Sequence, residues 1–406
     1  MDESVPMDEQ EDLLADPEER RVLHAAFDSF RQYRRAAHYN VTHLRRQSFY
    51  ALPAAQVERL SSPPFSLPKT FDAIDNAIDS NADIAEAIVK ETMPNFGIDP
   101  TDDSWKGQAT RNDFDKARST IRQIYRDWSA EGLPERHACF SPIMAALETY
   151  LPAASPAQRH FSRVLVPGAG LGRLVFDICL AGYSVEGTEI SYHQVLASQY
   201  LINYTDRARE HTLYPWALSF SNHQTRDNQL RGVKIPDIHP GTALDKAHQE
   251  LGLDVHYGDR MSMSSGDFCV VYRQPDCRGV FDAVVTCFFI DTAPNVIHYI
   301  ETVKHCLRSS GVWINLGPLL WHFESTLTPA ERDKARGRTK VAANEFEGIA
   351  EPGSFELSNE EVISLVEQYG FEMVEQTEAS ATGYIQDPTS MLQNVYRPAF
   401  WVARKK

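Results

Sequence analysis

A glycine-rich turn near residue 170 could bind a nucleotide-like cofactor. Residues 163–174 are Arg-Val-Leu-Val-Pro-Gly-Ala-Gly-Leu-Gly-Arg-Leu, an apolar strand that leads through Gly168, Gly170 and Gly172 into an amphipathic helix. Glycine allows a tight turn and lets backbone amides approach a ligand, because no Cβ stands in the way. Glu189 follows about 20 residues after the first glycine, where a carboxylate can accept hydrogen bonds from ribose hydroxyls.

The spacing of these glycines separates two classes of cofactor. A dinucleotide site takes G-x-G-x-x-G or G-x-G-x-x-A, whereas this turn has G-x-G-x-G followed by Arg173. The variant is similar to the first motif of the S-adenosylmethionine (SAM) methyltransferases. Those enzymes often carry an acidic residue just before the glycines, where this chain has Val166 and Pro167. A turn that only packs a helix on a strand is the structural alternative.

Composition argues against several classes of function. The 406 residues carry a formal net charge of −16, which argues against a broad basic surface for nucleic acid and favours a cationic or neutral substrate. The six cysteines form no C-x-x-C pair, so we expect no metal site. No apolar run approaches about 18 residues and the N-terminus is acidic, so we expect neither a membrane span nor a secretory signal. We therefore expect a soluble protein of the cytoplasm, with the nucleus as an alternative.

The N-terminal third is predicted to be helical after an acidic tail. Residues 1–19 contain nine acidic residues and no Lys or Arg, a composition typical of disorder. Apolar positions recur near a helical period from Glu19 to Leu52, and further helices are predicted over 71–91 and 112–130. We expect residues 20–150 to form a helical region that covers the cofactor site.

Strands and helices alternate from residue 151 to residue 406, which is typical of a parallel sheet with helices on both faces. The predicted strands are 163–166, 183–187, 254–258, 281–289 and 312–316, with antiparallel partners at 371–375 and 398–402. An insertion at about 207–246 has no clear period and is too long for an ordinary connection, so it is either a functional lid or an ornament. The predicted fold is therefore α/β, a Rossmann-like sheet with an N-terminal helical extension and an inserted lid segment.

Several polar residues are predicted at the carboxyl ends of the strands, where such sheets bind ligands. Asp267 could accept a hydrogen bond from the exocyclic amine of adenine, and Phe268 could stack on the ring. The alternative is a polar loop with one core aromatic residue. Asp291 directly follows an apolar strand, so its carboxylate should have a partner, either a ligand or the helix that begins near Pro294. His322 could bind substrate or satisfy a loop hydrogen bond.

Five segments together resemble the carnosine N-methyltransferase family. They are Gln123-Ile-Tyr-Arg-Asp-Trp-Ser129, the turn Pro167–Arg173, Gly266-Asp-Phe268, the strand that ends at Asp291, and Asn315-Leu-Gly-Pro-Leu-Leu-Trp-His-Phe-Glu324. The resemblance extends from about Arg20 to the C-terminus and includes Leu213-Tyr-Pro-Trp216 in the insertion. It implies a class I SAM methyltransferase that methylates the imidazole Nπ of carnosine, giving anserine, and of related histidine dipeptides.

The resemblance also implies which residues contact each ligand. Those implied to contact SAM are Gln123, Arg126, Gly168, Glu189, Asp267, Phe268 and Cys287, together with Gly170 of the same turn. Those implied to line the peptide site are Asp291, His322, Tyr384 and Tyr396. Trp321 stands where a tyrosine is common in the animal enzymes, which bears on the shape of the peptide pocket.

The chemistry of these side chains agrees with the implied roles. Gln123 and Arg126 lie three residues apart on one predicted helix, so they share a face and could clasp the methionyl carboxylate of SAM. Asp291 is the candidate catalytic residue. By accepting a hydrogen bond from the Nτ proton of the substrate imidazole, it would select the tautomer with a free Nπ and stabilise the positive charge that develops there.

Three other functions remain as alternatives. The same chemistry could act on histidine within a protein or on another small imidazole. A non-catalytic SAM-binding scaffold is a third alternative, whereas Arg173 disfavours an NAD-dependent dehydrogenase because it replaces the third dinucleotide glycine. The expected partner is a small histidine dipeptide, and the sequence leaves open whether the protein forms a homodimer.

Overall fold

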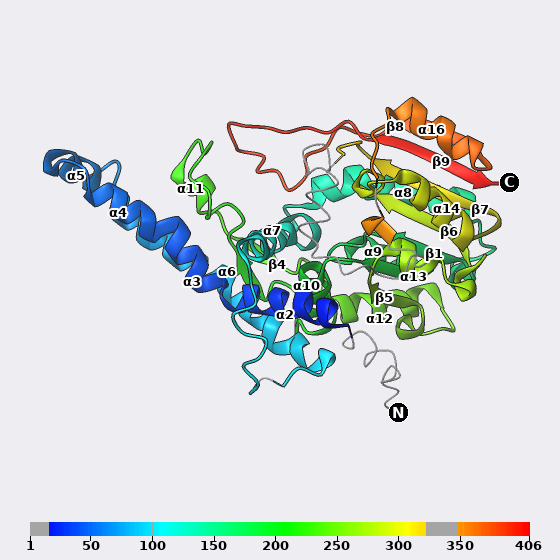
Figure 1. Ribbon diagram of the computed structural model, residues 1–406, viewed down its shortest axis with the longest axis horizontal. Helices are drawn as coiled ribbons and strands as arrows, with labels where there is room; N and C mark the ends of the chain where they lie inside the picture. Colours follow the sequence, from blue (N-terminus) through cyan, green and yellow to red (C-terminus); the bar gives the residue numbers. More distant parts are fainter. Residues whose placement is uncertain (1–15, 100, 322–347, 352) are drawn as a thin grey trace. The chain divides into compact units, whose positions relative to one another are not determined.

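The computed structural model describes residues 16–99, 101–321, 348–351 and 353–406 (Figure 1). Its contacts divide the chain into two units. Unit 1 comprises Met1–Leu133, Tyr192–Gly241 and Tyr384–Asn394, and unit 2 comprises Pro134–Ser191, Thr242–Gly383 and Val395–Lys406. Each unit has buried apolar clusters of its own.

A seven-stranded sheet forms the centre of unit 2 and confirms the α/β fold. Its strands are β1 (Arg163–Pro167), β2 (Ser184–Glu189), β5 (Met261–Ser265), β6 (Phe281–Cys287), β7 (Leu307–Gly317), β8 (Phe371–Glu378) and β9 (Ala399–Lys405). Their order is β5-β2-β1-β6-β7-β9-β8, and β9 runs antiparallel to the other six strands. The chain moves outward from β1 to β5 and, in the other direction, from β6 to β7. The order therefore reverses between β1 and β6, and such switch points are where α/β sheets bind ligands.

Helices cover both faces of this sheet. Those mainly in unit 2 are α8 (Leu133–Tyr150), α9 (Arg173–Leu180), α12 (Pro240–Leu251), α13 (Phe268–Tyr272), α14 (Val296–Cys306) and α16 (Asn359–Gln368), with the short turns η3 (Pro156–Phe161), η4 (Tyr257–Asp259), η5 (Pro275–Cys277), η6 (Ile290–Thr292) and η7 (Gly348–Ala350). The crossovers through α9 and α14 step in opposite directions, so right-handed connections place these helices on opposite faces. Helix α16, orange in Figure 1, packs against β8.

The prediction of a strand at 254–258 is wrong. That stretch leads into η4, where Gly258 N donates to the imidazole Nδ1 of His256 at 3.1 Å, and the strand β5 comes after it. β5 lies at the edge of the sheet and none of its residues is fully buried. Its sequence, Met-Ser-Met-Ser-Ser, therefore carries no apolar run by which it could be found.

Unit 1 is largely helical. Its elements are α2 (Pro17–Arg31), α3 (Tyr33–Ala37), the π-helical turn η1 (His38–His43), α4 (Leu44–Tyr50), α5 (Ala54–Ser61), α6 (Leu67–Thr92), η2 (Met93–Phe96), α7 (Arg111–Trp128), α10 (Tyr192–Asn203), α11 (Arg226–Gln229) and the antiparallel strands β3 (His211–Leu213) and β4 (Val233–Ile235). The sequence pattern predicted one long helix from Glu19 to Leu52, and the structure divides this stretch into α2, α3, η1 and α4. Within the described ranges, no helix is both long and apolar enough to cross a membrane.

Because the imidazole of His193 is buried, we predict that unit 1 loses stability in acid. Its side chain lies between α10 and α2, with Nε2 3.0 Å from Ser29 Oγ, and burial lowers its pKa to about 4. The unfolded chain takes up this proton near pH 6.5, before the folded chain does, so stability should fall by about 2 kcal/mol from pH 7.5 to pH 5. Urea unfolding of unit 1 at several pH values measures this loss.

The matched control for this prediction is the exposed His43 of η1. His193→Asn should flatten the acid dependence of the unfolding free energy, whereas His43→Asn should leave it as in the wild type. An unchanged acid slope in His193→Asn would show that another group is responsible.

Candidate active site

The glycine turn joins β1 to α9 at the switch point of the sheet. Gly168, Gly170 and Gly172 have φ of 66°, 58° and 74°, in the left-handed region that favours glycine. A Cβ on Gly168 would stand 2.3 Å from Cδ2 of Phe289. The first glycine is therefore required by packing as well as by its backbone conformation.

Glu189 ends β2 and holds this turn. The side chain is only 6% exposed. Its Oε2 accepts a hydrogen bond from Gly170 N at 2.9 Å, and Oε1 accepts one from Ser191 N at 2.9 Å. Burial raises the pKa of Glu189, and these amides oppose that rise. A carboxylate has about four lone-pair sites, so Glu189 retains capacity for the hydroxyl donors of a ribose.

Asp267 and Phe268 have structural roles at the end of β5. Asp267 caps α13, since its Oδ1 accepts from Cys269 N at 2.7 Å, and its Oδ2 accepts from Ile349 N at 2.7 Å. Phe268 is buried in the core, with its ring edge-on to those of Phe289 and Tyr299 at centroid distances of 5.8 and 5.6 Å. This is the arrangement of a polar loop with a core aromatic residue. The adenine contacts of both residues stay predictions.

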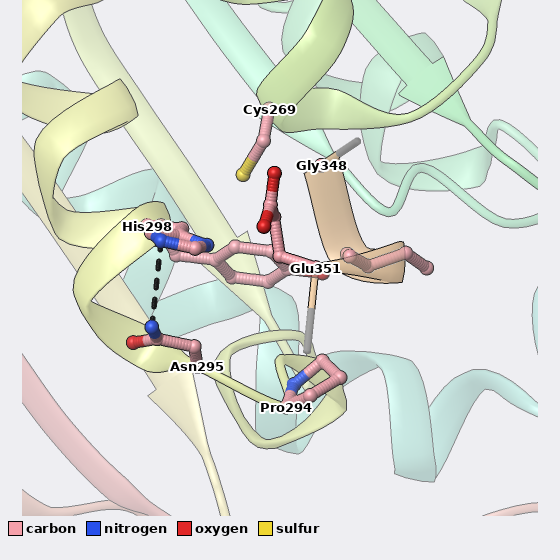
Figure 2. Close-up of a pocket in the computed structure, with 8 residues that line it drawn as sticks. Cys269, Pro294, Asn295, His298, Gly348 and Glu351 are labelled. Carbon is pink, nitrogen blue, oxygen red and sulfur yellow. Dashed lines mark hydrogen bonds between the residues drawn. The ribbon is translucent and has the colours of Figure 1, made fainter. Parts of the chain in front are cut away.

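Figure 2 shows a small pocket beside this loop. Its lining residues are Cys269, Pro294, Asn295, His298, Tyr299, Gly348, Ile349 and Glu351. None of these residues was predicted as a site residue from the sequence. The available signal was the spacing of Asn295 and His298, three residues from each other at the start of α14. In the structure, Asn295 Nδ2 lies 3.4 Å from His298 Nε2. The pocket adjoins Asp267 through the Ile349 amide.

The backbone turns sharply after Cys287, at the end of β6. Phe288 has φ of 55°, a conformation that is strained for a bulky residue. Its amide donates to Leu316 O at 2.8 Å, and a Cβ on Gly317 would stand only 3.1 Å from Phe288 N. The strand predicted to run to residue 289 therefore ends two residues earlier. Half-buried Cys287 is left at the carboxyl end of the sheet.

Asp291 lies in η6 just beyond this turn and is 3% exposed. Its Oδ2 accepts a hydrogen bond from Leu320 N at 2.8 Å, which ties the end of β6 to the segment after β7. The alternative role as the cap of the next helix is wrong. Asn295 caps α14, with its side-chain oxygen accepting from Ile297 N at 3.1 Å.

Tyr396 joins the same end of unit 2. It forms a β-bridge with Thr382, and its ring lies edge-on to that of Phe288 at 5.7 Å. The structure thus brings Cys287, Asp291 and Tyr396 together around one strained turn. His322 lies outside the described residues. Its neighbour Trp321 donates from Nε1 to Leu357 O at 3.1 Å.

In unit 1, the structure brings Gln123, Arg126 and Tyr384 together. The first two are buried on α7, where Gln123 Oε1 accepts from Gln194 Nε2 at 2.7 Å. Arg126 Nη1 donates to Asp127 Oδ1 at 2.9 Å, and its guanidinium carbon lies 4.8 Å from the centre of the Tyr384 ring. Two residues implied to contact SAM therefore share a unit with one implied to line the peptide site.

Comparisons with known proteins agree on one family. Residues 103–406 match the family model described as carnosine N-methyltransferase. The carnosine N-methyltransferase of Schizosaccharomyces pombe is 35% identical over 390 residues, which cover 96% of this chain and 97% of that protein. That of Mus musculus is 34% identical over 392 residues, which cover 95% and 86%.

Solved structures give a weaker likeness. One is phosphoethanolamine N-methyltransferase 2 of Haemonchus contortus in complex with SAM, with a TM-score of 0.36 and 11% identity over 73% of this chain and 58% of that one. Another is magnesium protoporphyrin IX methyltransferase from Synechocystis with a TM-score of 0.32 and 15% identity, covering 79% of this chain and 100% of that one.

Gly168→Ala is predicted to destabilise unit 2 more than its backbone conformation alone requires. The added Cβ meets the Phe289 ring, so overpacking of about 1–3 kcal/mol adds to the strain of a left-handed alanine, itself about 1 kcal/mol. Gly279→Ala is the matched control, because Gly279 has φ of 65° and its Cβ would meet no atom closer than 3.9 Å. Urea unfolding measures both costs, and equal costs would contradict the packing argument.

Proposed function

The chain belongs to the carnosine N-methyltransferase family, and we propose that it transfers the methyl group of SAM to the imidazole Nπ of carnosine and of related histidine dipeptides. The observation that carries this proposal is the extent of the similarity. The alignment with the Schizosaccharomyces pombe relative covers nearly the full length of both chains. The family model matches residues 103–406, a range that includes the residues proposed for both ligands. The reversal of strand order between β1 and β6 supports it, because ligands of such sheets bind there.

The residues present fit a SAM site. SAM supplies an electrophilic methyl group on a sulfonium sulfur when it is bound. We propose that Glu189 accepts hydrogen bonds from the ribose hydroxyls, while Gly168 and Gly170 let the backbone approach the ligand. Arg126 provides a fork of donors suited to the methionyl carboxylate, and Gln123 adds an amide donor.

Asp267, Phe268 and Cys287 are proposed to complete the cofactor contacts. Asp267 accepts backbone amides on both oxygens. A carboxylate nevertheless has lone pairs for a further donor such as the adenine amine. Cys287 stands at the carboxyl end of β6, where the sheet reverses its order. These three assignments rest on the family resemblance and on position in the sheet.

We propose that Asp291 is the catalytic residue. Imidazole has a pKa of about 6.5, so much of the substrate is neutral near pH 7 and no strong base is needed. The Leu320 amide and burial orient the Asp291 carboxylate. In that position Asp291 can accept a hydrogen bond from Nτ–H, which leaves the Nπ lone pair for attack and stabilises the growing positive charge.

The remainder of the peptide site is proposed from three further residues. Tyr396 lies against the strained turn that precedes Asp291, and Tyr384 faces Arg126. Tyr384 and His322 are assigned by the family resemblance. Trp321 takes the place of a common tyrosine, and its bulk would narrow the choice of dipeptide.

Asp291→Asn is expected to lower kcat by about 100-fold or more. The neutral amide offers both a donor and an acceptor, so it no longer enforces one tautomer, and it cannot stabilise the imidazolium by charge. SAM binding should change by less than about threefold, since the carboxylate acts on the other substrate. Steady-state kinetics with carnosine and calorimetric titration with SAM separate the two effects. Asp276→Asn, an exposed aspartate of η5, is the control. A nearly unchanged kcat in Asp291→Asn would remove this assignment.

The choice of substrate is tested by supplying several imidazoles side by side. Carnosine and related dipeptides should be turned over with much higher kcat/KM than free histidine or a histidine-bearing protein peptide. Preference for the peptide would favour protein histidine as the substrate. Tight SAM binding without turnover of any imidazole would indicate a non-catalytic scaffold. Mass spectrometry with fragmentation identifies the nitrogen that carries the new methyl group.

A further inference from the structure

The loop Tyr384–Asn394 is part of unit 1 although it lies far along the chain from the other segments of that unit. It pairs with the insertion, since Met391 N donates to Asn222 O at 2.8 Å and Ser390 forms a β-bridge with His223. At its other end, the Tyr384 ring lies over the Arg126 guanidinium at 4.8 Å. The loop therefore connects the insertion to the helix that carries Arg126.

The backbone of this loop is strained beside Tyr384. Ile385 has φ of 53°, in the left-handed region, and its side chain is buried. A β-branched residue is a rare outlier in this region, and other contacts must compensate for the strain. Because Ile385 directly follows Tyr384, its backbone conformation helps to set the direction of the tyrosine side chain.

The contacts that can compensate converge on Asp387, which is 5% exposed. Its Oδ1 accepts from Thr389 N at 2.9 Å, from Thr389 Oγ1 at 2.7 Å and from Arg231 Nη2 at 3.3 Å. Its Oδ2 lies 4.0 Å from His223 Nδ1. One buried carboxylate thus joins the turn of the loop to Arg231 of the insertion, and its other oxygen lies near the His223 ring.

We propose that Asp387 is a positioning residue, which fixes the loop on the insertion and so holds Tyr384 against Arg126. The inference rests on the proposed function, because Tyr384 is assigned there to the peptide site. On this basis the insertion around residues 222–231 is an anchor for the substrate loop. Asp387 acts through Tyr384 on binding of the dipeptide, and it does not touch the reacting atoms.

Asp387→Ala should raise KM for carnosine by about tenfold while kcat changes by less than about threefold. The chain offers a closely matched control in Asp99, an exposed residue that accepts the same two turn contacts from Thr101 N at 2.8 Å and Thr101 Oγ1 at 2.7 Å. Asp99→Ala should leave KM unchanged. Asp387→Asn keeps an oxygen for Thr389 but loses the charge that faces Arg231, so its KM should be intermediate.

A double-mutant cycle distinguishes positioning from general stability. In a Tyr384→Ala background, Asp387→Ala should raise KM by less than about twofold more, because the residue through which it acts is already gone. Hydrogen exchange supplies a readout apart from activity. Amides of residues 385–394 should exchange faster in Asp387→Ala, whereas those of α6 should be unchanged.

The inference would be overturned by a wild-type KM in folded Asp387→Ala, or by effects of Asp387→Ala and Tyr384→Ala on KM that simply add. Faster exchange throughout unit 1 would likewise show a general structural role. Failure of the wild type to methylate any imidazole would instead overturn the proposed function. The exchange of residues 385–394 would still test the anchoring by Asp387 in that case.

Discussion

The buried carboxylate of Glu189 is the interaction on which the carboxyl end of the sheet depends. Burial disfavours its charged form, and amides of Gly170 and Ser191 offset that cost by donating to its two oxygens. Gly170 can present its amide in this way because the turn follows a left-handed path. The same carboxylate therefore holds the end of β2 against the glycine turn after β1 and supplies the acceptors proposed for a ribose.

A second constraint operates on the other side of the switch point. The left-handed Phe288 ends β6, and Gly317 allows the backbone of β7 to pass close to it. Asp291 then accepts the Leu320 amide. Strain at Phe288 and burial at Asp291 thus place a carboxylate at a strand end, a position where α/β enzymes commonly carry their chemistry. Ile385 repeats this pattern beside Tyr384, with Asp387 as the compensating group.

Local sequence patterns were informative wherever local physics decides the outcome. The glycine turn, Glu189 at the end of β2 and the buried strand β6 follow from residue type, spacing and apolar runs. The same logic fails at β5, because an edge strand of Met and Ser needs no apolar run. It also could not choose between a ligand and a helix cap as the partner of Asp291, since Asn295, four residues later, is an equally good cap.

The amino-acid sequence by itself determined the α/β class, the glycine turn with its acidic partner and, through resemblance, the family. Those properties depend on short-range spacing and on residue types that few other structures require. Only the tertiary structure decided that Asp267 accepts the Ile349 amide, that Phe268 is a core residue, and that the loop Tyr384–Asn394 belongs with the insertion and with Arg126. These relations join residues up to about 260 positions apart, and packing between such distant segments leaves no periodic signal in a single sequence.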